Sequence, residues 1–333
     1  MKRWGAAKPG FGSECDFCGV ANVRSRREWF ATWTIAAIVA LVAGSTSANP
    51  TTAAAADVPR PDSIAVRAGD VAIRIEGSKM WTLSGIEYRH KTMAVEESAY
   101  GTILTIRNVG TLGSAHFLDV PGQPGVVEKE IVTHLRFHLD DRLLMDSPPK
   151  VSLEGRSFRM ERRSRIRDAE IESRLMLNDG VLTESARVRT KVAIDLRIGG
   201  AVMYAWTPAA TDYLFGDDEG VRSRGKFLPE GAKPTEGGDK SARWMAVYDA
   251  VGGQGAVCLV TKQPPGAGTW LQFTDAPGVY RKTRLLFFPE QIMPAGFDGT
   301  FETATGFFVA TAANWEGEAR RIAGKLGSLG APK

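Results

Sequence analysis

The sequence IESRLMLNDGVLTESARVRTKVAIDL, residues 171–196, carries the clearest structural signal of the chain. Apolar and polar residues alternate on both sides of the Asn-Asp-Gly turn at 178–180, and a period of two is typical of strands that bury one face. Gly180 tolerates the positive φ that a tight hairpin turn requires. We therefore predict an antiparallel hairpin in which residues 171–177 pair with residues 181–196.

Similar alternating segments recur along the chain, separated by turns rich in Gly, Pro, Asp and Asn. Each is long enough for one strand, and no helical pattern lies between consecutive segments. We predict strands at residues 70–75, 102–107, 131–139, 201–206, 244–249, 255–261, 269–273, 281–288 and 302–310.

This many strands without interleaved helices predict an all-β fold, a large antiparallel β-sandwich of the supersandwich-like kind. We expect the sandwich to occupy residues 57–312 and a short C-terminal helix and tail to occupy residues 313–333. Apolar residues at helical spacing, such as Trp315 and Ile322, indicate the helix. Residues 225–243 are rich in Gly, Pro and charge, which predicts a long loop that is either disordered or a functional flap.

Residues 1–56 have the layout of an export signal. Arg26 and Arg27 precede an apolar stretch at residues 35–43, and small residues follow as far as Ala48. Paired arginines followed by aromatic residues resemble the twin-arginine type of leader. We expect a periplasmic or extracellular protein whose leader is cleaved. An uncleaved anchor is the alternative, although a membrane-spanning helix needs about 20 apolar residues and this stretch is shorter.

Charge and cysteine content exclude several functional classes. Removing residues 1–48 takes away six basic and three acidic residues and lowers the formal net charge from +4 to +1. The remaining body therefore has no basic footprint for a nucleic acid. Cys15 and Cys18 could form half a zinc site, but no second ligand pair follows, so no metal or other cofactor is predicted. Cys258 lies in an apolar strand and is expected to be a core side chain.

A row of basic side chains on one strand is the first candidate site. His134, Arg136 and His138 project to the same face of the strand at 131–139, opposite its apolar residues. Such a row could hold an anionic or polyhydroxyl ligand and exchange protons near neutral pH. His116 lies in a glycine-containing segment that could approach the same ligand. A solvated outer face is the simpler interpretation of this row.

Residues 206–220 form the second candidate site, which we expect to be an aromatic and acidic loop after a strand. Trp206 and Tyr213 could stack on the C–H face of a sugar, and Asp212 could accept hydrogen bonds from its hydroxyls. Acids at 217–219 could also gather calcium, but the spacing of a calcium loop is missing, so a solvated turn is favoured.

An exported, strand-rich body with a His/Arg strand face and a Trp/Asp/Tyr segment resembles the galactose-mutarotase-like supersandwich. The resemblance is architectural and covers about residues 60–310. That architecture occurs in sugar epimerases and in domains of polysaccharide lyases and glycosidases. No catalytic motif of the family aligns on this chain, so the resemblance implies a fold and a carbohydrate-related role rather than a site.

Two hypotheses follow from the sequence. In the first, the protein binds or acts on saccharides, and His134 or His116 exchanges a proton with substrate while Asp212 or Glu184 acts as its partner. In the second, the sandwich is a non-catalytic structural or partner-binding envelope protein. The sequence leaves open whether the protein is an enzyme and what its oligomeric state is, and it predicts membrane contact only through an uncleaved leader. The expected ligand-binding residues are Arg136, His138, Trp206 and Tyr213.

Overall fold

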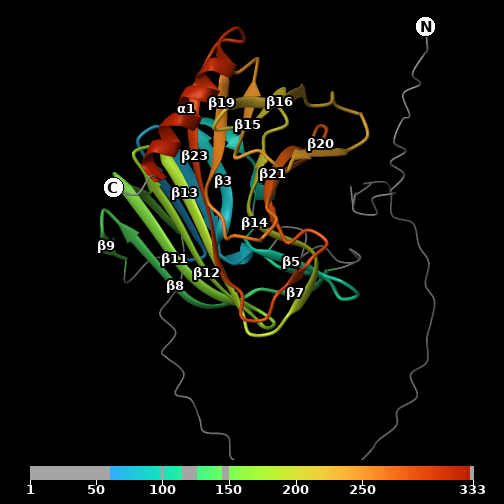
Figure 1. Ribbon diagram of the computed structural model, residues 1–333. Helices are drawn as coiled ribbons and strands as arrows, with labels where there is room; N and C mark the ends of the chain where they lie inside the picture. The colour runs from blue at the N-terminus through green and yellow to red at the C-terminus, as the bar shows by residue number, and fades with distance from the viewer. Residues whose placement is uncertain (1–60, 99–100, 115–125, 145–149, 331–333) are drawn as a thin grey trace, which may run out of the picture. The chain divides into compact units, whose positions relative to one another are not determined.

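The computed structural model describes residues 61–98, 101–114, 126–144 and 150–330. These residues belong to one compact unit, Pro59–Lys333. Two β-sheets are stacked in this unit, and one helix lies at its C-terminal end (Figure 1). The predicted all-β sandwich with a C-terminal helix is therefore confirmed. The predicted leader, with Cys15 and Cys18, lies outside the described residues. Within the described ranges, no helix is long and apolar enough to cross a membrane.

Sheet 1 has thirteen strands among the described residues. Its pairs are antiparallel except for β1 with β10 and β6 with β7, which are parallel. Its central path runs in the order β10 (Lys150–Glu154), β1 (Ser63–Ala68), β2 (Val71–Glu76), β3 (Thr82–Tyr88), β4 (Lys91–Ala94), β14 (Ile194–Trp206), β21 (Tyr280–Phe287), β20 (Trp270–Ala276) and β17 (Thr235–Asp239). Attached to this path are β5 (Ile103–Ile106), β6 (Gly110–Gly113), β7 (Val126–Lys129) and β22 (Ile292–Met293).

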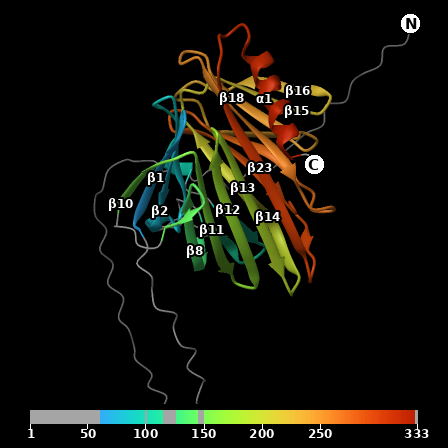
Figure 2. The same ribbon diagram turned by 90° about the vertical axis from the view of Figure 1, so that its left-hand side faces the viewer.

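Sheet 2 has ten strands in the described part of the chain, and each pair is antiparallel. Figure 2 shows several of its strands running side by side. Their order is β16 (Gly220–Lys226), β15 (Asp212–Asp217), β18 (Trp244–Asp249), β19 (Gln254–Lys262), β23 (Asp298–Val309), β13 (Val181–Thr190), β12 (Ala169–Asn178), β11 (Ser157–Ile166), β8 (Ile131–Leu139) and β9 (Arg142–Leu143). The remaining elements are the helix α1 (Trp315–Gly330) and two 3₁₀ turns, η1 (Gly77–Lys79) and η2 (Glu96–Ser98).

The predicted hairpin is formed by β12 and β13, and Asn178 pairs with Val181 across its turn. Asp179 and Gly180 have φ values of 48° and 74°, as a two-residue turn with both central residues at positive φ requires. The second strand is shorter than predicted, because β13 ends at Thr190 and the next alternating residues begin β14 in sheet 1. The apolar and polar residues keep alternating from β13 into β14. The sequence pattern therefore does not show that the chain passes from sheet 2 to sheet 1 between these strands.

Two apolar layers hold the fold together. The layer between the sheets includes Phe287 of β21 and Phe301 of β23, whose rings stack with their centroids 4.5 Å apart. The second layer lies between sheet 2 and α1, where Trp315 stacks on Tyr248 at 5.0 Å. Strands β18, β19 and β23 are thus covered on both faces. This burial accounts for their nearly continuous apolar sequences.

Two expectations about loops are corrected. The predicted loop at 206–220 contains β15 and the start of β16, and the predicted loop at 225–243 contains β17. The sequence of β17 is TEGGD, which has no strand-forming pattern, yet it pairs in register with β20. Its two glycines allow the strand to pass close to the side chains of Phe273 and Trp270, where a larger residue would collide.

Candidate functional site

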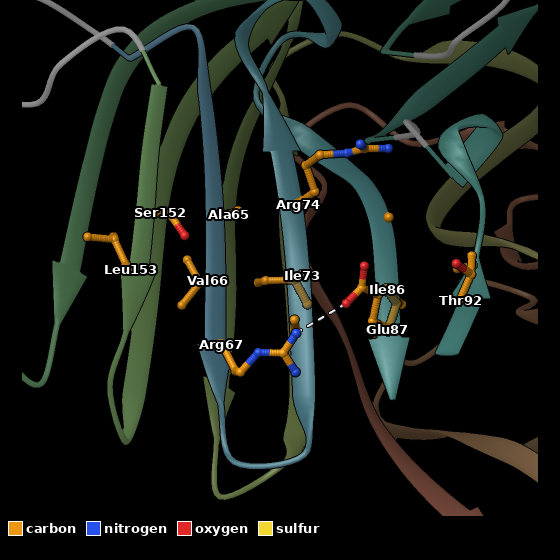
Figure 3. Close-up of a pocket in the computed structure, with 13 residues that line it drawn as sticks. Ala65, Val66, Arg67, Ile73, Arg74, Ile86, Glu87, Thr92, Ser152 and Leu153 are labelled. Atoms are coloured by element: carbon orange, nitrogen blue, oxygen red, sulfur yellow. Dashed lines mark hydrogen bonds and ion pairs between the residues drawn. The ribbon is translucent and has the colours of Figure 1, made fainter. Parts of the chain in front are cut away.

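A groove of about 420 Å³ crosses the outward face of sheet 1 over β10, β1, β2 and β3 (Figure 3). We call it the outer groove and define it by its outward-facing residues. Its volume lies within the range of roughly 300–1,000 Å³ that is usual for small-molecule sites. These defining residues are Ala65, Arg67, Ala72, Arg74, Gly85 and Glu87.

The outer groove arises from small residues at outward positions. Strand alternation sends Val66 and Ile73 into the core and leaves the residues between them facing out. Across the strands, Ala72 lies between Arg67 and Glu87 in register. Ala65 and Gly85 likewise flank Arg74. Each long charged side chain therefore stands beside a residue with one methyl group or none, and the surface between the charges is depressed.

The charged groups of the outer groove are arranged as pairs. Arg67 Nη2 lies 3.2 Å from Glu87 Oε2 (Figure 3), and Ala72 lies between these two residues in the strand register. Arg74 Nε lies 3.2 Å from Glu76 Oε1, and the Arg74 side chain is 52% exposed. A guanidinium has five N–H donors, so one carboxylate contact leaves donors for a ligand. The groove thus offers hydrogen-bond donors and acceptors side by side above an apolar floor.

The predicted row on β8 has the orientation that the sequence indicated. Phe137 faces the core and is 5% exposed, whereas His134, Arg136 and His138 point to the other face. His138 Nδ1 lies 3.3 Å from Arg159 Nη2 of the neighbouring strand β11. Among the described residues, only the two-residue strand β9 lies beyond β8 in sheet 2. The row is therefore close to an edge of the sandwich.

The structure does not bring the two candidate sites together. Six strands separate β8 from β15, which carries Asp212 and Tyr213. At about 4.8 Å per strand, His134 and Asp212 are on the order of 30 Å apart along the sheet. One sugar ring cannot contact both side chains. His116, the other predicted proton-transfer residue, lies outside the described residues.

Trp206 and Tyr213 are packing residues in this structure. Trp206 is 2% exposed, and its indole N–H donates a hydrogen bond of 2.9 Å to Thr283 Oγ1. Tyr213 packs against Phe227 and Phe273, with ring centroids 5.1 and 4.6 Å away. The expected role of Trp206 as a stacking platform is corrected, because a ring buried on both faces has no surface for a sugar. The preceding residues 201–205 of β14 are all apolar and buried, so the sequence does not indicate which face of the strand carries the ring.

Glu184, the alternative proton-transfer residue, faces the interior between the sheets. Burial raises the pKa of its carboxyl group to about 7, although Tyr204 and Arg162 favour the charged form. Arg162 and Glu130 are also buried and lie 3.4 Å apart between Nη2 and Oε1. The interior of the sandwich therefore contains three ionisable groups close to one another, which we call the interior polar centre.

A further charged cluster lies on β20, β21 and β17 and was not predicted. Arg284 Nη2 lies 2.7 Å from Glu236 Oε1, and Arg284 Nε donates to Gln272 Oε1 at 2.6 Å. Burial lowers the pKa of Lys282, which faces the same side of β21, to about 7. The sequence signal is the alternation of Lys282 and Arg284, but the partners on β17 fall in the segment that was expected to be a loop.

Other chemical expectations can be compared with the structure directly. Cys258 is buried, and burial raises the pKa of its thiol to about 12, which agrees with a core side chain rather than a nucleophile. In the described part of the chain, no group of three or more His, Cys, Asp or Glu residues could hold a metal ion.

No protein-family model matches the sequence, and no curated protein matches it either. Similar architectures occur among solved structures. The galactosidase domain of an alpha-galactosidase-sucrose kinase matches with a TM-score of 0.45 and 10% identity over 74% of this chain and 40% of that one. A galactose mutarotase-like protein from Lactobacillus casei ATCC 334 matches with a TM-score of 0.43 and 8% identity over 74% and 100%.

A galactose mutarotase-like protein from Clostridium acetobutylicum matches with a TM-score of 0.39 and 11% identity, over 73% of this chain and 94% of that one. At these identities and TM-scores the likeness concerns architecture alone. It is the architectural resemblance that the sequence indicated, and it assigns no residue a role.

Proposed function

We propose that the protein is exported and that it binds a saccharide in the outer groove. The observation that carries this proposal is the combination of small floor residues, Ala65, Ala72 and Gly85, with ion-paired charged side chains that stand beside them. A sugar ring has a C–H face and a rim of hydroxyl groups that both donate and accept hydrogen bonds. The floor suits the C–H face, and the arginines and Glu87 suit the hydroxyl rim.

The composition of the outer groove favours a saccharide over other ligand classes. Its two arginines are each paired with a carboxylate, so the groove has no excess of positive charge that would select a nucleic acid. It is an open groove with small residues on its floor and charged side chains beside them, rather than the deep apolar cavity that a lipid chain would require. Binding is the function that this geometry supports, and the proposal includes no catalytic step.

Binding of the full-length chain to an array of neutral and uronic-acid oligosaccharides tests the proposal. We expect specific binding by the wild-type protein and at least a tenfold loss in two groove variants. Arg67→Gln removes the cation that pairs with Glu87, and Ala72→Phe fills the floor between them. The matched control is Arg163→Gln on β11, because Arg163 is an exposed and ion-paired arginine of the other sheet.

Two results would contradict binding in the outer groove. One is wild-type affinity in both groove variants, which would place the ligand elsewhere. The other is the absence of binding to any saccharide by a folded wild-type protein, which would favour the structural or partner-binding hypothesis. Export is tested separately by fractionating cells that express the full chain and by measuring the mass of the recovered protein, since cleavage near Ala48 removes the leader.

A further inference from the structure

The interior polar centre has an unequal number of positive and negative groups. Glu130 accepts hydrogen bonds from Ser114 and Ser164 and lies beside Arg162. Glu184 lies on β13 of sheet 2, the sheet that also carries Arg162. It adds a second carboxyl group near the guanidinium of Arg162. One buried cation neutralises one buried carboxylate, so the other carboxyl is stabilised as the neutral acid.

Arg162 connects the two sheets. Its Nη1 donates a hydrogen bond of 2.7 Å to the carbonyl oxygen of Met80, which precedes β3 in sheet 1. Its Nη2 lies 3.4 Å from Ser173 Oγ on β12. The Nε–H of the same guanidinium has no hydrogen-bond partner among the described residues and no contact with bulk solvent. A buried donor of this kind is costly unless something accepts from it.

Glu184 presents the complementary atom. Its Oε1 is also shielded from bulk solvent and has no partner within the described ranges. Both Arg162 and Glu184 line one small cavity between the sheets, with a volume of about 30 Å³. Sheet 1 contributes Val202 to its wall, where β14 has a bulge and a φ of 53°. The side chains that carry this unpaired donor and this unpaired acceptor therefore line the same cavity.

We propose that this cavity is a binding site for a single water molecule that joins the two sheets. The water accepts a hydrogen bond from Arg162 Nε and donates one to Glu184 Oε1. Water has both functions in one molecule, and a site for it needs roughly 10–15 Å³ of accessible volume and at least two polar partners. A larger hydroxylic ligand exceeds the cavity.

Crystals of the full chain that diffract to about 1.5 Å test the site. We expect a density peak within hydrogen-bonding distance, about 3.2 Å or less, of both Arg162 Nε and Glu184 Oε1. Glu184→Gln keeps an acceptor oxygen and should retain the peak. Glu184→Met has a similar length but no acceptor, and the peak should be lost.

Two outcomes would overturn the proposal. The first is a wild-type map in which both side chains are ordered and no peak lies between them. The second is an anomalous peak at this position after a bromide soak, which would identify an anion site instead. Because the wild-type crystal alone decides between peak and no peak, the test remains valid if either variant fails to fold.

Discussion

Glu184 places an acidic group in the interior between the two sheets, where it interacts with Tyr204 and Arg162. Tyr204 of β14, which is 1% exposed, interacts with its carboxyl group across the two sheets. Burial opposes the ionised form more strongly than Tyr204 and Arg162 support it, and the pKa is therefore raised to about 7. Such a pKa indicates a protonated side chain in mildly acidic solution and an ionised one in alkaline solution.

The raised pKa predicts how stability depends on pH. Glu184 binds its proton more tightly in the folded chain, with a pKa of about 7 against 4.5 when unfolded. Its contribution to the free energy of unfolding is therefore largest below pH 4.5 and falls, by roughly 3 kcal/mol, as the pH rises to 7. Glu184→Gln cannot ionise, so its stability relative to wild type should increase by that amount between pH 4.5 and 8.

Urea denaturation of both proteins at several pH values measures this difference. The other titrating groups are shared, so they cancel in the comparison. If the stability difference between wild type and Glu184→Gln were constant from pH 4.5 to 8, the Glu184 carboxyl would not have a raised pKa.

Trp206 gives a second prediction for a single residue. Trp206→Phe removes the donor to Thr283 Oγ1 in the core, and we expect a loss of about 1–3 kcal/mol in stability with no change in saccharide affinity. Trp270→Phe is the matched control, since Trp270 Nε1 has no hydrogen-bond partner in the described structure and its removal should cost less. Loss of saccharide binding in a folded Trp206→Phe protein would restore the ring as a ligand contact.

At the scale of elements, the sequence predicts strands and helix better than it predicts their partners. The limits of β8 and β18 agree with the predicted 131–139 and 244–249, because β8 alternates without a break and β18 is almost wholly apolar, each between turn residues. β17 was missed because Thr235–Asp239 gains its stability from pairing with β20, which local sequence does not encode. Strand order depends on such long-range pairing.

The helix α1 is held on sheet 2 mainly by its apolar face, and the exposed pair of Arg224 and Glu316 adds a polar contact at 3.0 Å. Leu326 is 1% exposed, whereas Leu329 on the same helix is 62% exposed. Leu326→Ala should lower the free energy of unfolding by about 2–5 kcal/mol, because it leaves a cavity against sheet 2. Leu329→Ala should change it by less than about 0.5 kcal/mol. Equal effects of the two substitutions in thermal or urea unfolding would show that α1 does not pack on β19 and β23 as described.

At the scale of the whole molecule, the candidate site depends on register more than on recognisable motifs. Arg67, Ala72 and Glu87 are unremarkable in sequence, and only the pairing of β1, β2 and β3 sets them in one row. The residues that attracted attention in sequence, His134 and Trp206, lie on different sheets. The sequence therefore shows which chemical groups are available, whereas it does not show which strands pair and thus which of these groups lie side by side.

The central claim is that a saccharide occupies the outer groove, and methyl NMR of alanine-labelled protein tests it most directly. Titration with the best oligosaccharide from the array should shift the Ala65 and Ala72 methyl signals and leave that of Ala256, buried in β19 of sheet 2, unchanged. Saturable shifts of the two groove methyls are the predicted result. Unchanged groove methyls during saturating binding would contradict the account.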